Sequence, residues 1–171
     1  MPPDALYVQS RYDEATAVLK EARANFIEVG SVLYAARCSQ NLGEILRLQS
    51  RYGEATAVLK EARVQFTEIC DINGATGCSQ DLGNVLHMQR RCDEATDVLQ
   101  DARAKFIEIG SDLGATQCSQ SLGNILWMLN QYDKAATVLK EARVKFIELG
   151  DVLGATQCLL TLGEIDRKSV V

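Results

Sequence analysis

The sequence repeats itself at intervals of forty residues. GATGCSQDLGNVLHM begins at Gly74, GATQCSQSLGNILWM at Gly114 and GATQCLLTLGEI at Gly154. The chain divides into the units 11–50, 51–90, 91–130 and 131–170 without an insertion or a deletion. Such a period is typical of arrays in which each unit packs on its neighbours. We therefore predict a single repeat array over residues 1–171.

Each unit contains two segments with helical periodicity. In the first of them, residues 11–30, charged side chains such as Lys20 and Arg23 occupy the face opposite the apolar stripe. Neither helix can bury its stripe alone, so the units must pack on one another. The first stripe is Ala15, Leu19, Ala22, Phe26 and Val29, and the second is Ala35, Cys38, Leu42, Ile45 and Leu46.

A glycine stands in the middle of the second segment of every unit, at Gly43, Gly83, Gly123 and Gly163. Glycine inside a helix costs about 0.8–1 kcal/mol relative to alanine. These glycines lie between apolar residues, on the face that is predicted to meet a neighbour. We predict that the missing side chain lets another helix approach closely, and that tight packing offsets the cost.

The corner between the two segments also follows a pattern. Gly30, Gly110 and Gly150 stand where the first helix should end, a position that favours the left-handed conformation. Ser31, Asp71, Ser111 and Asp151 follow as candidate N-caps of the second helix. Cys70 replaces the glycine in one unit, where a left-handed backbone would cost roughly 1–2 kcal/mol. We therefore expect that corner to close differently.

The charge and hydropathy of the chain exclude two classes of partner. The net charge is −5, the pI is about 5.0, and no block of Lys or Arg stands out. A protein that binds phosphate backbones needs a basic face, so we expect no nucleic-acid partner. No apolar run approaches the roughly 20 residues of a membrane span, and the N-terminus lacks the regions of a secretory signal. We expect a soluble, cytoplasmic protein without a membrane partner.

The cysteines and the single histidine do not have the spacing of a metal or catalytic site. Cys38, Cys78, Cys118 and Cys158 recur once per unit, and we interpret them as small, buried, reduced thiols. No CxxC spacing occurs, and His87 is the only histidine, so no metal site is predicted. No phosphate-binding glycine loop, HExxH motif or nucleophile beside a histidine occurs. We expect no enzymatic activity, no catalytic residue and no cofactor.

Leu42, Gly43, Tyr52, Ala55 and Ala62 form a pattern that resembles the tetratricopeptide repeat (TPR). The forty-residue form, with G-D-x-x-G-A between units, is similar to the repeats of kinesin light chains and spindle-orientation adaptors, and to arrays in fungal NLR-like receptors. The resemblance implies an all-α fold, a TPR-like α-solenoid of antiparallel helix pairs that forms a right-handed superhelix. The sequence departs from the family's pattern at Ser39, Ser79 and Ser119, where a bulky aromatic residue is expected, and at Cys92, where tyrosine is expected.

The resemblance also implies a binding groove, because in this family the helix that carries Leu-Gly lines a concave surface that meets a peptide. An amide donates and accepts hydrogen bonds at once, so a column of Gln and Asn could clamp the backbone of an extended peptide or of a partner protein. A solvated polar helix face is the alternative interpretation. The implied groove residues are Arg37, Gln40, Glu44, Arg47, Gln80, Asn84, His87, Gln117, Gln120, Asn124, Trp127 and Gln157.

Two further features concern one groove residue and the faces opposite the groove. Trp127 is the only tryptophan, and it is either a binding anchor or a cover for the junction to the next helix. The opposite faces carry the predicted helical ion pairs Asp101–Lys105 and Glu141–Lys145.

The two ends of the sequence look uncapped. Residues 1–10 resemble the truncated remnant of a preceding helix, and Leu159 and Leu160 replace the polar residues of earlier units. Repeat arrays normally need a polar capping helix for solubility. We therefore expect a fragment of a longer array, or a homo-oligomer that forms end to end or by exchange of terminal helices. The leading function is a protein-binding scaffold; the alternative is a structural spacer or self-assembling module, natural or engineered.

Overall fold

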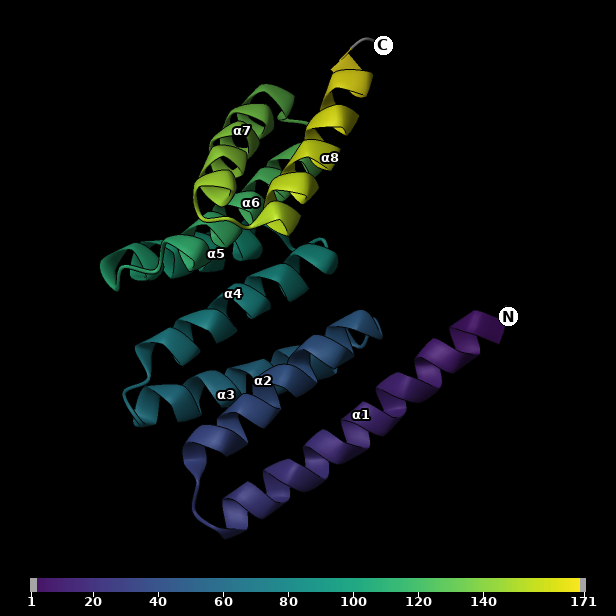
Figure 1. The fold of residues 1–171 in the computed structure, drawn as a ribbon, viewed down its shortest axis with the longest axis vertical. Coiled ribbons are helices and arrows are strands. Elements are labelled where there is room, and N and C mark those ends of the chain that lie inside the picture. Colours follow the sequence, from purple (N-terminus) through teal and green to yellow (C-terminus); the bar gives the residue numbers. More distant parts are fainter. Residues whose placement is uncertain (1–2, 170–171) are drawn as a thin grey trace. The chain divides into compact units, whose positions relative to one another are not determined.

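The computed structural model describes the backbone of residues 3–169 and the side chains of residues 9–168. All regular elements in this part of the chain are α-helices, so the predicted all-α class is confirmed (Figure 1). None of these helices is long and apolar enough to cross a bilayer. The helices are α1 (Pro3–Glu28), α2 (Val32–Leu48), α3 (Tyr52–Glu68), α4 (Ile72–Met88), α5 (Cys92–Glu108), α6 (Asp112–Met128), α7 (Tyr132–Glu148) and α8 (Val152–Ser169).

The helices form two compact units, and the boundary falls between the second and third sequence repeats. Unit 1 ends at Arg90 and contains α1 to α4, and unit 2 begins at Arg91 and contains α5 to α8. Within each unit consecutive helices pack in pairs, and α2 also packs on α4, as α6 packs on α8 (Figure 1). We call α2, α4, α6 and α8 the Leu-Gly helices, and α1, α3, α5 and α7 the partner helices.

The predicted apolar stripes form the cores. In unit 1 Ala62, Phe66 and Cys78 belong to one buried cluster. In unit 2 a larger cluster joins α7 to α8, and Leu126 and Trp127 pack against it. Burial of a Leu or Phe side chain stabilises by about 1.5–3 kcal/mol, so these contacts hold the helix pairs together. Val29 is exposed instead, because α1 ends before it and the chain turns there.

Two of the mid-helix glycines, Gly43 and Gly123, make the close approach that the sequence predicts, whereas nothing lies within 4 Å of a Cβ added to Gly163. A Cβ added to Gly43 would come within 2.6 Å of the Leu59 side chain, and one added to Gly123 within 2.7 Å of Leu139. In both places a Leu-Gly helix receives a leucine of the partner helix that follows it. Tight packing is therefore what offsets the low helix propensity of these two glycines.

A second glycine contact closes each helix pair from Gly74 onwards. A Cβ at Gly74, Gly114 or Gly154 would lie 2.5–2.7 Å from the ring of the phenylalanine eight positions before it. The first pair differs because Tyr34 occupies the corresponding position. There the rings of Phe26 and Tyr34 stack with centroids 5.1 Å apart, and Phe26 stays half-buried.

The expectation that Cys70 closes its corner differently is wrong. Its φ is 59°, in the same left-handed region as Gly30 at 72°. Cys70 N donates to Thr67 O at 3.1 Å and Asp71 N to Phe66 O at 2.9 Å, the pattern that also closes the corner at Gly30. The helix pair that packs on either side fixes the turn, and this packing outweighs a strain of about 1–2 kcal/mol.

The capping residues divide by type. Asp71 accepts from the backbone N–H of Gly74, and Asp151 from that of Gly154, both at 2.9 Å. Ser31 and Ser111 occupy the same position without a side-chain cap hydrogen bond. The aspartate caps are therefore confirmed and the serine caps are not.

The N-terminal residues 3–10 are part of the first helix. They continue into α1 as one helix. Gln-Ser-Arg-Tyr occurs at 9–12, where it is helical, and at 49–52, where it forms a turn with Ser50 at a φ of 59°. The packing of α2 on α3 stabilises the turn, whereas residues 9–12 lie inside α1 and follow their helix propensity.

Of the two predicted helical ion pairs, one forms. Lys105 Nζ lies 2.8 Å from Asp101 Oδ2, as predicted. Lys145 pairs with Glu148 at 2.7 Å and not with Glu141. Both spacings bring charges together on a helix, and exposed pairs are worth only about 0.3–0.5 kcal/mol, so sequence spacing alone does not decide between them.

Candidate functional site

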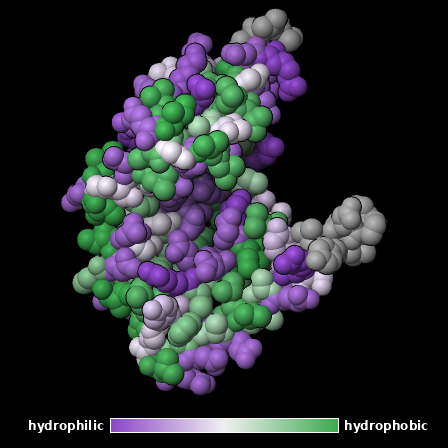
Figure 2. Space-filling view, in the orientation of Figure 1, coloured by the Kyte–Doolittle hydropathy of each residue, from purple (hydrophilic) through white to green (hydrophobic). Residues whose placement is uncertain are grey.

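The candidate site is the polar face that the Leu-Gly helices of each unit present, which we call the amide face of that unit. It is positioned by the apolar stripe of the same helices: Leu42 and Leu46 are buried in unit 1, and this fixes the direction of the residues between them. Figure 2 shows hydrophilic side chains gathered over α4. Of the predicted groove residues, Arg37, Glu44 and Gln157 are exposed. The half-buried ones are Gln40, Arg47, Gln80, Asn84, His87, Gln117, Gln120, Asn124 and Trp127.

In unit 2 the amide face joins α6 to α8 by hydrogen bonds. Gln120 Nε2 donates to Gln157 Oε1 at 3.0 Å. The hydroxyl of Thr161 donates to Asn124 Oδ1 at 3.3 Å. Both bonds connect residues 37 positions apart, so the same alignment of α6 with α8 produces both. The structure thus brings three of the predicted amides together, and it adds Thr161.

In unit 1 a different pair of repeat positions joins the two Leu-Gly helices, and a carboxylate takes part. Gln40 Nε2 donates to Asp81 Oδ2 at 2.9 Å, which joins α2 to α4. On α2, Arg47 binds Glu44 through two hydrogen bonds of 2.8 and 2.6 Å. This bond is the main reason why the pKa of Arg47 is raised. The amide face of unit 1 therefore carries charged groups. In unit 2 the residues Gln120, Asn124 and Gln157 of this face are neutral.

Asp81 is the most perturbed carboxyl group of this face. Its burial raises its pKa to about 6. The bond from Gln40 lowers this pKa, the nearby Glu44 raises it, and the charge of Arg47 lowers it. Burial dominates because a desolvated carboxylate loses its hydration, and one amide donor replaces only part of it. Protonation of Asp81 near pH 6 would change the charge of the face.

His87 and Trp127 lie near the ends of their helices. Burial lowers the pKa of His87, so its imidazole is neutral at neutral pH. Trp127 packs on the core cluster of unit 2, and Lys168 Nζ lies 4.9 Å from its ring centroid. Its Nε1 is buried without a hydrogen-bond partner. Trp127 therefore covers the junction with the following helix pair. Its indole N–H is a hydrogen-bond donor that is not used.

Sequence reasoning missed Asp81 and Thr161, although both are visible in the repeat alignment. They occupy one repeat position with Asn41 and Ser121, and this position follows the glutamines of the predicted column. The helical pattern alone does not show that this position contacts the preceding Leu-Gly helix. The recurring polar type was the signal that could have found it.

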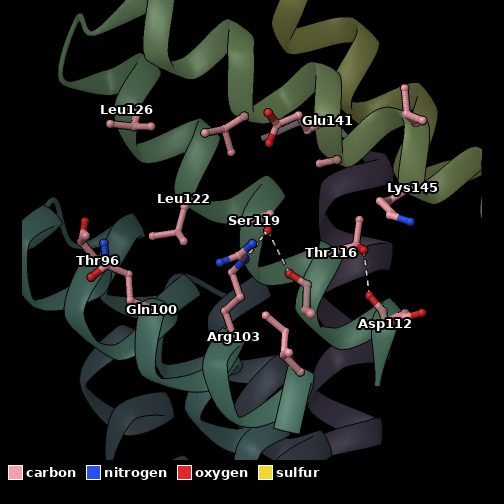
Figure 3. Close-up of a pocket in the computed structure, with 15 residues that line it drawn as sticks. Thr96, Gln100, Arg103, Asp112, Thr116, Ser119, Leu122, Leu126, Glu141 and Lys145 are labelled. Carbon is pink, nitrogen blue, oxygen red and sulfur yellow. Dashed lines mark hydrogen bonds between the residues drawn. The ribbon is translucent and has the colours of Figure 1, made fainter. Parts of the chain in front are cut away.

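Sequence reasoning also missed a cleft of about 1000 Å³ in unit 2. It lies between α5, α6 and α7, and its apolar residues include Leu122, Leu126 and Val138. In Figure 3, Arg103 points into the cleft toward Ser119, and Glu141 lies on the opposite wall. Arg103 Nε donates to Ser119 Oγ at 2.8 Å. A polar rim over an apolar floor makes this cleft a second candidate interaction surface.

The corresponding residues of unit 1 are arranged differently. Arg23 of α1 forms an ion pair with Glu61 of α3. Arg23 Nε and Ser39 Oγ are then both buried without a hydrogen-bond partner. An arginine at this repeat position can therefore reach either the serine of the Leu-Gly helix or the glutamate of the next partner helix.

The thiols and acidic side chains do not assemble a metal site. No cluster of three or more potential His, Cys, Asp or Glu ligands occurs among the described residues. Cys38, Cys78, Cys118 and Cys158 are buried thiols outside disulfides, as predicted. Burial raises the pKa of Cys78 to about 12 and that of Cys158 to about 11. These two thiols are therefore protonated and unreactive at neutral pH.

No family model and no curated protein matches the sequence. Solved structures do. BtubC from P. vanneervenii matches with a TM-score of 0.75 and 18% identity, over 94% of this chain and 66% of that one. The Rap conjugation gene regulator of the plasmid pLS20, solved in complex with the Phr* peptide, matches with a TM-score of 0.72 and 17% identity, over 96% of this chain and 51% of that one.

A third match is to the nearly identical TPR-like repeats of a protein from Podospora anserina. The TM-score is 0.64 at 12% identity, over 94% of this chain and 90% of that one. The chain has a TPR-like repeat fold. The resemblance drawn from Leu42, Gly43, Tyr52, Ala55 and Ala62 is thereby confirmed for the fold. This chain spans less than two thirds of the first two proteins, so their full activities are not transferred to it.

Proposed function

We propose that this chain is a non-catalytic protein-interaction scaffold that binds an extended peptide segment along the amide face. The TPR-like fold is the frame for this proposal, because pairs of Leu-Gly helices hold polar side chains side by side. The observation that carries it is the pair of interhelical bonds Gln120–Gln157 and Asn124–Thr161. They hold amide groups in fixed positions at the surface.

Fixed amides suit the recognition of a peptide backbone. A side-chain amide has two N–H donors and an oxygen with two acceptor sites. The bond between Gln120 and Gln157 uses one donor and one acceptor, so both groups keep capacity for a ligand. Since these groups are already ordered, binding costs little further side-chain entropy. A segment with an exposed backbone and uncharged side chains fits unit 2 best.

The two units differ in the ligands that they favour. Unit 1 places Asp81, Glu44 and Arg47 on the amide face, and unit 2 places neutral Gln120, Asn124 and Gln157 there. A ligand that passes along unit 1 therefore needs polar or charged side chains that match these groups. The similar Rap regulator was solved with a bound peptide, which supports a peptide as the ligand class.

The test is selection of ligands from a phage-displayed library of random peptides. A selected peptide is made synthetically, and its affinity is measured by calorimetry. We expect Asn124→Ala to weaken binding about three- to tenfold, the loss of roughly one hydrogen bond. Gln120→Ala should have an effect of similar size.

Asp101→Ala is the matched control, because Asp101 is an exposed residue of a partner helix outside the amide face. We expect it to leave the affinity unchanged. Selection of no peptide, or equal binding by the Asn124→Ala and Asp101→Ala variants, would contradict the proposal.

A further inference from the structure

The last Leu-Gly helix, α8, has an open socket. Gly43 and Gly123 each receive a leucine of the following partner helix, but nothing lies within 4 Å of a Cβ at Gly163. Leu159, one turn away, is 53% exposed, whereas Ser39 and Ser79 at its repeat position are buried. Leu160 is 67% exposed. Figure 2 shows apolar side chains at the surface over α8.

The first partner helix, α1, exposes the side chains that would fit such a socket. Leu19 is half-buried, whereas Leu59 and Leu139, its equivalents, are buried against a preceding Leu-Gly helix. Val18 is 64% exposed, although Val58 and Val138 at the same repeat position are half-buried. Among the described residues, α1 therefore offers the leucine that Gly163 lacks, and α8 offers the glycine that Leu19 lacks.

A cavity lies where, by the repeat pattern, another Leu-Gly helix would pack against α1 and α2. It measures about 660 Å³ and lies between α1 and α2, with Val18, Leu19 and Ile45 among its lining residues. In unit 2 the corresponding position beside α7 and α8 is occupied by α6, and in unit 1 the position beside α3 and α4 is occupied by α2. The surface formed by α1 and α2 thus resembles two surfaces of the same chain, each of which is covered by a preceding Leu-Gly helix.

We propose that α8 of one copy packs on α1 and α2 of a second copy, with Leu19 of the second copy in the socket at Gly163. This interface repeats the one that α2 makes with α3 and α4. The packing inside the chain therefore indicates that a Leu-Gly helix of a second copy covers α1 and α2. It goes beyond peptide binding and does not depend on it.

The polar residues agree with this arrangement. Asn124 meets Thr161 across a repeat offset of 37 positions. The same offset places Glu164 of one copy opposite Asn41 of the other, and Asn41 lines the cavity. An amide donates to a carboxylate, so this contact would repeat the bond that Gln40 makes to Asp81.

Such a contact uses a different surface on each copy, so it is heterologous. A linear assembly of any length keeps one free α1–α2 surface at one end and one free α8 at the other, so association can continue. The number of copies in an assembly therefore depends on concentration and is not limited to two.

The first test is sedimentation velocity of the whole chain from about 1 µM to about 300 µM, a range suited to a small interface. We expect the weight-average sedimentation coefficient to rise with concentration. Gly163→Leu fills the socket and Val18→Asp places a charge on the α1–α2 surface. Both positions are exposed, so the variants should keep the helical circular dichroism of the wild type.

We expect each of these two variants alone to remain monomeric over the whole range. An equimolar mixture should form heterodimers, because one variant keeps its α8 and the other keeps its α1–α2 surface. The controls are Gly53→Leu, at another open glycine in a helix, and Val64→Asp, at another exposed valine. Both controls should associate like the wild type.

Three results would overturn the proposal. The wild type could remain monomeric at all concentrations, which would leave α8 uncovered or covered within one copy. Val18→Asp alone could associate like the wild type, which would indicate a symmetric contact through α8. The mixture could also remain monomeric, which would exclude a contact between the two surfaces.

Discussion

Leu59 lies against Gly43 so closely that a Cβ at Gly43 would be 2.6 Å from its side chain. Leu139 and Gly123 repeat this relationship in unit 2. The glycine is therefore a packing requirement at Gly43 and Gly123, where the following partner helix lies in the same unit. Within one copy nothing lies within 4 Å of a Cβ at Gly163, so in a single copy this glycine weakens the helix without a packing gain.

This difference predicts opposite effects of one substitution. Gly123→Ala should lower the free energy of unfolding by about 1–3 kcal/mol, because the new methyl group overpacks against Leu139. Gly163→Ala should raise it by up to about 1 kcal/mol, because alanine is the better helix former. Urea unfolding at low protein concentration measures both. Equal changes at the two positions would show that the socket at Gly123 is not tight.

The first helix pair predicts a second contrast. Phe66 is buried against Gly74, and Phe26 is half-buried against Tyr34. Phe66→Ala should cost about 3–5 kcal/mol, the usual cost for a buried aromatic side chain. Phe26→Ala should cost clearly less, because its ring already contacts solvent. Thermal or urea unfolding of the two variants checks this, and a larger loss for Phe26→Ala would contradict the packing described.

The fold was predictable because its determinants recur in each unit. The period, the apolar stripes and the mid-helix glycines indicate the same helix pair in every repeat. The prediction of the fold therefore did not depend on any single residue. Local details were harder. Gln-Ser-Arg-Tyr is helical at 9–12 and forms a turn at 49–52, since packing and not local sequence decides between these states. Cys70 adopts a glycine conformation for the same reason.

Asp81 gives a prediction for the dependence of stability on pH. Its pKa is raised to about 6 in the folded chain, above the ordinary value of about 3.9. Between these values the folded chain holds a proton that the unfolded chain has released. The free energy of unfolding therefore falls as pH rises through this window, by about 1–3 kcal/mol from this residue.

Asp81→Asn removes this titration and keeps an oxygen that can accept from Gln40. We expect the variant to be more stable than the wild type by about 1–3 kcal/mol near pH 7, and similar to it near pH 4. Urea unfolding at both pH values measures the difference. A difference between the two proteins that does not change with pH would contradict the burial assigned to Asp81.

The cysteines predict an ordered pattern of chemical labelling. Cys70 is exposed and Cys92 is half-buried, whereas Cys38, Cys78, Cys118 and Cys158 are buried. An aromatic disulfide reagent at neutral pH should therefore label Cys70 first and Cys92 more slowly, because buried thiols open only with the structure. Cys70→Ser should remove the fast phase. Rapid reaction of all six thiols in the native protein would contradict the burial described.

The site was less predictable than the fold, and particular residues show why. The resemblance to the TPR family placed Gln40, Gln120, Asn124 and Gln157 on one face, but it does not show which side chains meet. That depends on the offset between neighbouring Leu-Gly helices, which sets the contact of Gln40 with Asp81. The cleft beside Arg103 was missed because it arises from the spacing of α5 and α7, a property of packing.

The central claim is that the amide face, and not the cleft beside Arg103, is the recognition surface. The most direct test is nuclear magnetic resonance of nitrogen-labelled protein titrated with a selected peptide. We predict shifts in the side-chain amide signals of Gln120, Asn124 and Gln157 and in the single indole signal of Trp127. Shifts confined to Arg103, Leu122 and Val138 at the cleft, with the side-chain amide and indole signals unchanged, would contradict it.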